Sequence, residues 1–130
     1  MDELGFILYD LIQKKDFDKI NGIIGNYVNH KDHDKELVKY IHSEKAMLNK
    51  QYDLAISLYN EILIHKPNML LVELKFAQAL IYVKHYESAL SIYQNIKTKY
   101  KGRISIRLTE FIKNKIIDLE NKIIGKVQLS

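Results

Sequence analysis

The stretch YDLAISLYNEILI at residues 52–64 returns as YESALSIYQNIKT at residues 86–98. Each key residue of the first stretch recurs after 34 positions. The matched pairs are Tyr52 and Tyr86, Ala55 and Ala89, Leu58 and Ile92, Tyr59 and Tyr93, and Ile62 and Ile96. The segments ahead of them also align, with Ser43 opposite Ala77. A repeat of this length, with apolar residues three and four apart, predicts stacked pairs of helices.

Working outward from these stretches, the apolar spacing predicts a helix before each of them. The expected helices are 35–48 and 52–65 in one pair, and 69–83 and 86–100 in the next. Asn49-Lys50-Gln51 is expected to form the turn of the first pair. Pro67 ends the second helix, because proline cannot continue it, and Gly102 is the expected C-cap of the fourth.

The N-terminal segment predicts a degenerate copy of the same unit. Its expected helices cover residues 3–14 and 17–28. Phe17 lies 35 residues before Tyr52, and Ile20 lies 35 before Ala55, so an isoleucine stands where the repeat has alanine.

The last expected helix runs from about Arg103 to Ile124, and Gly125 is its expected terminator. Its apolar residues follow a 4-4-3-4 spacing: Leu108, Ile112, Ile116, Leu119 and Ile123. We interpret it as a closing helix, because the exposed face of a final repeat must be covered. The alternative is a coiled-coil dimer seam, so the chain is expected to be a monomer or a weak dimer.

Together these patterns predict one all-α domain, a right-handed α-solenoid of about seven helices. It would contain three helical hairpins, over residues 1–34, 35–68 and 69–102, and a closing helix over 103–125. The small residues of the repeat would let neighbouring helices approach closely, and its tyrosines would fill the space between them.

The composition limits the possible functions. The chain contains no cysteine, which excludes disulfides and thiolate metal sites. No apolar run reaches the roughly 18–20 residues of a membrane span, so no membrane insertion by this segment is expected. No signal peptide is visible, although one could have been removed if the chain is an excised domain.

Charge is unevenly distributed along the chain. Residues 1–96 carry a net charge of −2, and residues 97–130 carry +6. The basic patch consists of Lys97, Lys99, Lys101, Arg103 and Arg107. Such a patch could attract nucleic acid, anionic lipid or an acidic partner, or it could be a solvated lysine face.

No residue pattern indicates catalysis. His30, Asp32 and His33 lie close together, but no third metal ligand is fixed by spacing, so we expect no metal site. The glycines form no phosphate-binding loop. Neither a cofactor nor an enzymatic activity is expected.

A partner-binding groove is expected on the first helix of each pair. Its candidate residues are Tyr9, Ile12, Tyr40, Glu44, Met47, Leu74, Lys75, Gln78, Ile81 and Tyr82. Tyrosine and methionine suit an adaptable recognition surface. The alternative is that several of these residues belong to the core.

The 34-residue pattern resembles the tetratricopeptide repeat (TPR), most clearly over residues 35–100. That resemblance implies a non-catalytic protein-interaction domain with a concave groove. Many such domains hold a partner's C-terminal carboxylate with Lys, Arg and Asn. Here Tyr9, Glu44 and Leu71 occupy groove positions of that clamp and Lys75 is the remaining basic residue, so carboxylate clamping is not expected.

A narrower resemblance is to the N-terminal periplasmic domain of the surface lipoprotein assembly modulator (Slam) family of Gram-negative bacteria. The residues that carry it are Lys15-Asp16-Phe17, Tyr27, Leu37-Val38-x-Tyr40, Tyr52-x-x-Ala55-Ile56-x-x-Tyr59, Pro67, Leu71-x-Glu73-Leu74-x-Phe76-Ala77-x-Ala79-Leu80 and Arg107.

The narrower resemblance implies a periplasmic module of an outer-membrane system that delivers surface lipoproteins or related secreted proteins. Its partner would be such a client, or the β-barrel of the same chain. One alternative is a free-standing cytoplasmic TPR adaptor or co-chaperone. A third function, binding of nucleic acid or anionic lipid through the basic patch, is not expected to be the main one.

Overall fold

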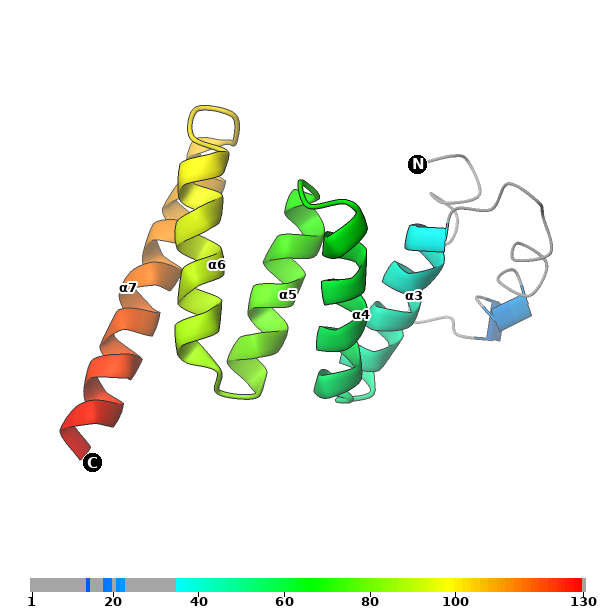
Figure 1. The fold of residues 1–130 in the computed structure, drawn as a ribbon, viewed down its shortest axis with the longest axis horizontal. Coiled ribbons are helices and arrows are strands. Elements are labelled where there is room, and N and C mark those ends of the chain that lie inside the picture. Colours follow the sequence, from blue (N-terminus) through cyan, green and yellow to red (C-terminus); the bar gives the residue numbers. More distant parts are fainter. Residues whose placement is uncertain (1–13, 15–17, 20, 23–34, 130) are drawn as a thin grey trace. The chain divides into compact units, whose positions relative to one another are not determined.

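The computed structural model describes residues 14, 18–19, 21–22 and 35–129, with side chains up to Lys126 (Figure 1). Five long helices occupy the described residues after position 34, and they are α3 (Lys35–Leu48), α4 (Tyr52–His65), α5 (Leu70–Tyr82), α6 (Tyr86–Lys99) and α7 (Ile106–Leu129). Residues 18–19 and 21–22 are also helical. The two complete helices expected before residue 30, and the groove candidates Tyr9 and Ile12, lie outside the described residues.

The repeat helices begin and end close to where the sequence predicts. Helices α3 and α4 have the expected bounds. Helix α5 is shorter by one residue at each end, because Met69 and Val83 are its N-cap and C-cap and have non-helical backbone angles. Helix α6 ends at Lys99, with Tyr100 as its C-cap. Gly102 follows in the turn with φ of +76°.

The prediction for the last helix was wrong at both ends. Helix α7 begins at Ile106, three residues later than expected, because the Ser105 side-chain oxygen accepts a hydrogen bond from the Leu108 N–H at 3.1 Å and caps the first turn. The helix continues to Leu129 through Gly125. Gly125 lacks the positive φ of a terminating glycine, and glycine costs only about 1 kcal/mol relative to alanine inside a helix.

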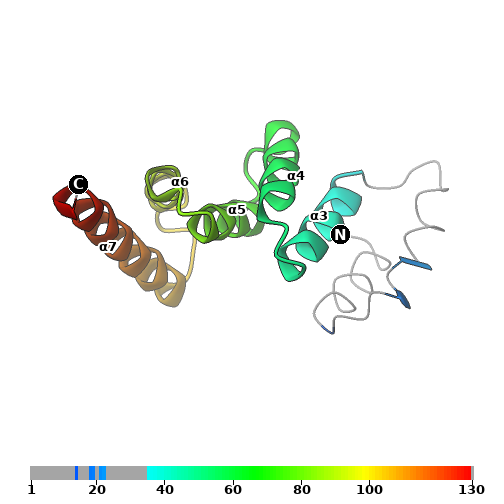
Figure 2. The same ribbon diagram turned by 90° about the horizontal axis from the view of Figure 1, so that it is seen from below.

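The chain forms two compact units, Met1–Ile62 and Leu63–Ser130. The first contains α3 and most of α4. The second contains the end of α4 and helices α5, α6 and α7, in which α6 contacts both α5 and α7. Figures 1 and 2 show α5, α6 and α7 alternating in direction along the chain.

The 34-residue correspondence is reproduced in the burial of the two units. In α4, the exposed fractions of Ala55, Tyr59 and Ile62 are all 0%. Their counterparts in α6 are equally buried: Ala89 and Ile96 at 0% and Tyr93 at 2%. Ser43 and Ala77 on the preceding helices are also at 0%. Equivalent sequence positions therefore form equivalent core positions.

Helix α7 uses its apolar stripe within the second unit. Ile112, Ile116 and Leu119 are buried, with exposed fractions of 1%, 9% and 0%, and the helix packs against α6. This packing favours the interpretation of α7 as a closing helix, because three of the five residues that a coiled-coil seam would need are already buried, whereas Leu108 and Ile123 are half-buried.

The turn after α3 closes with a Schellman motif. The Lys50 N–H donates to the Met47 carbonyl at 3.1 Å, and the Gln51 N–H donates to the Ala46 carbonyl at 2.8 Å. Lys50 has φ of +59°, the left-handed conformation that this motif requires.

The turn after α5 has the same motif 34 residues later. The Lys84 N–H donates to the Ile81 carbonyl and the His85 N–H to the Leu80 carbonyl, both at 2.9 Å. Lys84 has φ of +64°. The 34-residue repeat is therefore also present in the backbone hydrogen bonds of the two turns. In both turns a lysine holds the left-handed conformation, which glycine would adopt without strain.

Replacing Lys50 or Lys84 with glycine should stabilise the protein. The left-handed conformation costs an L-residue about 1–2 kcal/mol, and the extra chain entropy of glycine offsets part of the gain. We expect a net increase of roughly 0.5–1 kcal/mol in the free energy of unfolding, measured by urea denaturation. Lys101→Gly is the matched control, because Lys101 lies in a turn without positive φ. A loss of stability in both test variants would contradict this account of the turns.

Enlarging the small core residue of α6 should destabilise the second unit. Ala89→Leu adds carbon atoms at a site with no exposure, and overpacking costs roughly 1–3 kcal/mol. Ser91→Leu on the exposed face of the same helix is the control and should change the unfolding temperature little. If Ala89→Leu melted like the parent protein, Ala89 would not lie at a tight helix contact.

Candidate functional site

The groove candidates on α3 lie mostly in the core of the first unit. Tyr40 and Glu44 are only 6% and 7% exposed, whereas Met47 is half-buried. The Tyr59 hydroxyl of α4 donates a hydrogen bond to Glu44 Oε1 at 2.5 Å. Glu44 therefore binds the neighbouring helix, and α3 presents less of the expected groove than the sequence suggested.

Burial and the contact with Glu44 both disfavour ionisation of the Tyr59 hydroxyl. Burial raises the pKa of the Tyr59 hydroxyl well above its usual value of 10, and the negative charge of Glu44 raises it further. The pKa of Tyr59 is higher in the folded state than in the unfolded state, so burial of the neutral hydroxyl contributes its full stabilisation of the fold below pH 10. This contribution is lost as the pH rises beyond that.

Removing the Tyr59 hydroxyl should destabilise the first unit. Tyr59→Phe takes away a hydrogen bond from the buried Glu44 carboxylate, which costs about 1–3 kcal/mol. Tyr93→Phe is the matched control, because Tyr93 is the repeat equivalent and Gln78, the equivalent of Glu44, is exposed. Thermal unfolding of both variants measures the difference. Equal effects would show that the contact with Glu44 contributes nothing specific.

The groove candidates on α5 share one exposed or half-exposed face of that helix. Gln78 and Tyr82 are exposed, with Tyr82 at 52%, and Leu74, Lys75 and Ile81 are half-buried. Leu71, one turn before Leu74, is 41% exposed. Spacings of three, four and seven residues bring these side chains together on a helix. We call Leu71, Leu74, Lys75, Gln78, Ile81 and Tyr82 the α5 face.

The opposite side of α5 is held by a partly buried ion pair. Lys99 of α6 contacts the Glu73 carboxylate and also donates to the Pro67 carbonyl at 3.1 Å. Glu73 is 5% exposed. Lys99 also lies 5.2 Å from the centre of the Tyr100 ring. Lys99, which the sequence analysis assigned to the basic patch, is therefore a structural residue.

The remaining members of the basic patch separate into two groups. Arg103 stacks over the Tyr100 ring at 5.5 Å and is exposed, as is Arg107. Lys97 and Lys101 instead line a cleft between α6 and α7, which we call the α6–α7 cleft.

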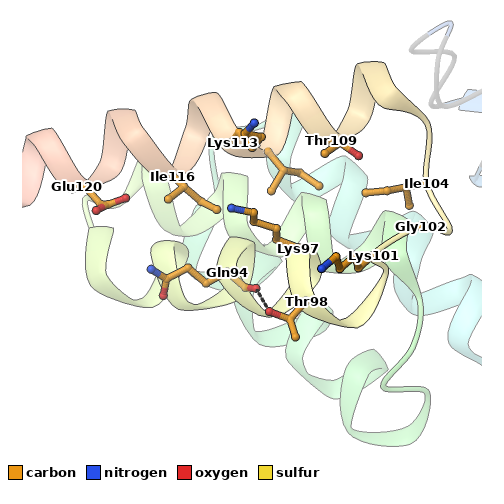
Figure 3. Close-up of a pocket in the computed structure, with 11 residues that line it drawn as sticks. Gln94, Lys97, Thr98, Lys101, Gly102, Ile104, Thr109, Lys113, Ile116 and Glu120 are labelled. Carbon is orange, nitrogen blue, oxygen red and sulfur yellow. Dashed lines mark hydrogen bonds between the residues drawn. The ribbon is translucent and has the colours of Figure 1, made fainter.

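The α6–α7 cleft has a volume of about 720 Å³ (Figure 3). Its floor is apolar and comprises Ile104, Ile112 and Ile116. Its walls carry Lys97 from α6, Lys101 from the turn after α6, and Lys113 from α7. The other lining residues are Gln94, Thr98, Gly102, Thr109 and Glu120. The arrangement combines an aliphatic surface with positive charge from two helices.

Sequence reasoning missed Lys113, Thr109 and Glu120. These residues and Ile116 are spaced three or four positions apart along α7, so periodicity alone could have placed them on one face. The sequence did not indicate that this face lies beside Lys97 and Lys101, because that depends on how α7 packs against α6.

The described part of the chain contains no group of three His, Asp or Glu side chains placed to hold a metal ion. Among the same residues, no helix is both long and apolar enough to cross a membrane. Two accessible features of the described residues, the α5 face and the α6–α7 cleft, suit contact with another macromolecule.

Comparison with known proteins gives one match. The family described as surface lipoprotein assembly modifier, N-terminal TPR repeats, matches residues 1–93, more than two thirds of the chain. Neither the curated proteins nor the solved structures gave a match. The family match agrees with the repeated burial and repeated turns of the two helix pairs. The chain therefore belongs to the family of N-terminal TPR repeats of surface lipoprotein assembly modifiers.

Proposed function

We propose that this domain binds a protein client or partner during the delivery of surface lipoproteins or related secreted proteins, and that the α5 face makes the contact. On this proposal the domain works in the periplasm, as part of an outer-membrane system, and catalyses no reaction. Membership of the family supports the pathway. The observation that carries the binding surface is the exposure of large apolar side chains on α5.

The α5 face exposes more apolar surface than the packing of the helix alone requires. Leu71 and Tyr82 are 41% and 52% exposed on a helix whose other side is buried. Exposed apolar surface bordered by polar groups is typical of interaction sites, and tyrosine is enriched among the residues that dominate binding energies. Lys75 and Gln78 lie between the apolar residues and add polar groups to this face.

The α3 candidates contribute little to this proposal. Tyr40 and Glu44 are almost fully buried, so a partner could reach them only by opening the core. A substitution of Tyr40 would test folding rather than binding. The proposed surface therefore rests on the α5 face, which lies wholly within the second unit.

Charge placed on the α5 face should weaken client binding without unfolding the domain. Leu71→Glu with Tyr82→Glu removes two exposed apolar contacts, and a central contact residue contributes more than about 1 kcal/mol. We expect an affinity at least roughly tenfold lower for a purified, delipidated surface lipoprotein, measured by calorimetry.

Ile106→Glu with Ile117→Glu is the matched control, because both isoleucines are exposed and lie on α7, away from the α5 face. This variant should retain the parent affinity, and circular dichroism should show that both proteins are folded. Unchanged affinity in a folded Leu71→Glu, Tyr82→Glu protein would remove the α5 face from the proposal.

A further inference from the structure

The α6–α7 cleft carries positive charge that the described part of the chain does not neutralise. Lys97 lies on α6 and Lys101 lies in the turn that follows α6, and neither has an ion-pair partner among the described residues. Like charges gathered in one cleft repel each other. Lys113 adds a third positive charge from the opposite wall and is only 3.8 Å from Glu110, in an exposed pair. An anionic group in the cleft would relieve this repulsion.

The floor of the cleft indicates an aliphatic component in the ligand. Ile112 and Ile116 are 1% and 9% exposed, and Ile104 is half-buried beside them. A volume of about 720 Å³ lies in the range of ligand-binding pockets. Carboxylates beside the lysines and an aliphatic side chain on the isoleucines are together the features of an acidic, amphipathic peptide.

The same lining disfavours nucleic acid. No aromatic ring lines the cleft, so bases would have nothing to stack on. No arginine lines it either, which leaves no bidentate contact to phosphate. Glu120 adds a negative charge that would repel a continuous phosphate backbone.

The two ends of the cleft also differ in charge. Glu120 and Gln94 lie at one end, and Lys101, Ile104 and Thr109 lie at the other (Figure 3). Thr109 and Glu120 are separated by about 16 Å along α7, which is about three turns of helix. A bound segment would therefore place its acidic residues toward the loop that joins α6 to α7, and a neutral or basic residue toward Glu120.

We propose that the α6–α7 cleft is a second docking site, which binds an acidic amphipathic segment of a partner protein. The carboxylates of the segment contact Lys97, Lys101 and Lys113, and an aliphatic side chain packs on Ile104, the half-buried isoleucine of the floor. This site lies on other helices than the α5 face and does not depend on the client-binding proposal.

The test uses a fluorescein-labelled helical peptide of about 12 residues, with glutamates four apart, leucines between them and a lysine at one end. Fluorescence anisotropy measures its affinity for the domain. A peptide with glutamine at each glutamate position should bind about tenfold more weakly, and binding of the acidic peptide should weaken as salt is added. Equal binding of the two peptides would overturn the proposal.

Lys97→Gln with Lys101→Gln should weaken binding of the acidic peptide by about tenfold. Lys84→Gln with Lys126→Gln has the same change in net charge at exposed positions outside the cleft and should leave the affinity unchanged. Ile104→Ser tests the apolar floor, because Ile104 is half-buried and not in the core, and should also weaken binding, with circular dichroism confirming the fold. Equal loss in the two lysine pairs would indicate general charge attraction and contradict a built site.

Two further measurements test whether nucleic acid or a second copy of the chain occupies the cleft instead of an acidic peptide. A single-stranded oligonucleotide should fail to displace the peptide; full displacement would indicate a nucleic-acid site instead. Sedimentation should give the same mass for the parent and the Lys97→Gln, Lys101→Gln protein; loss of a dimer in that variant would identify a second copy as the occupant. The Leu71→Glu, Tyr82→Glu protein should still bind the peptide, so failure of the two proposals can be distinguished.

Discussion

Close contact between helices at small side chains is the constraint on which both helix pairs depend. Ala55 and Ala89 have no exposed surface, and neither do Ser43 and Ala77 on the preceding helices. A larger side chain at such a position would push the helices apart, because core volume is already filled at crystal-like density. The hydroxyl of Ser43 donates to the Tyr40 carbonyl at 2.6 Å, so its burial leaves no unsatisfied polar group. Once these faces are fixed, the remaining face of each helix is left for other contacts.

The two units share this packing but differ in the polar groups that surround it. In the first unit, Glu44 is buried and accepts a hydrogen bond from Tyr59. At the equivalent position in the second unit, Gln78 is exposed, and the buried carboxylate is Glu73, held by Lys99. Buried ion pairs of this kind contribute little net stability but are costly to break. At the positions equivalent to Tyr40 and Glu44, α5 carries the half-buried Leu74 and the exposed Gln78, so its face is more accessible than that of α3.

The sequence predicted the repeated part of the fold well. Ala, Tyr and Ile returning after 34 residues indicated the helices and their buried faces, since periodicity reports directly which side of a helix is apolar. It predicted the end of α7 poorly, because an interior glycine only weakens a helix. It placed Glu44 among the groove candidates, with the core as the alternative, and Lys99 in the basic patch. Glu44 is buried beside Tyr59 and Lys99 pairs with Glu73, contacts that depend on other helices. The α6–α7 cleft could not be predicted, because it depends on how two helices separated by a loop are packed.

Residue-resolved amide hydrogen exchange of the parent protein tests most directly the claim that both pairs share one packing scheme. The account predicts slow exchange at the core amides of α4, at Tyr59 and Ile62, and comparably slow exchange at their equivalents in α6, Tyr93 and Ile96. The amides of Ile116 and Leu119 should also be protected, because α7 covers α6. Rapid exchange at Tyr59 and Ile62, with protection confined to α6 and α7, would contradict the account, since the first pair would then not be a packed repeat.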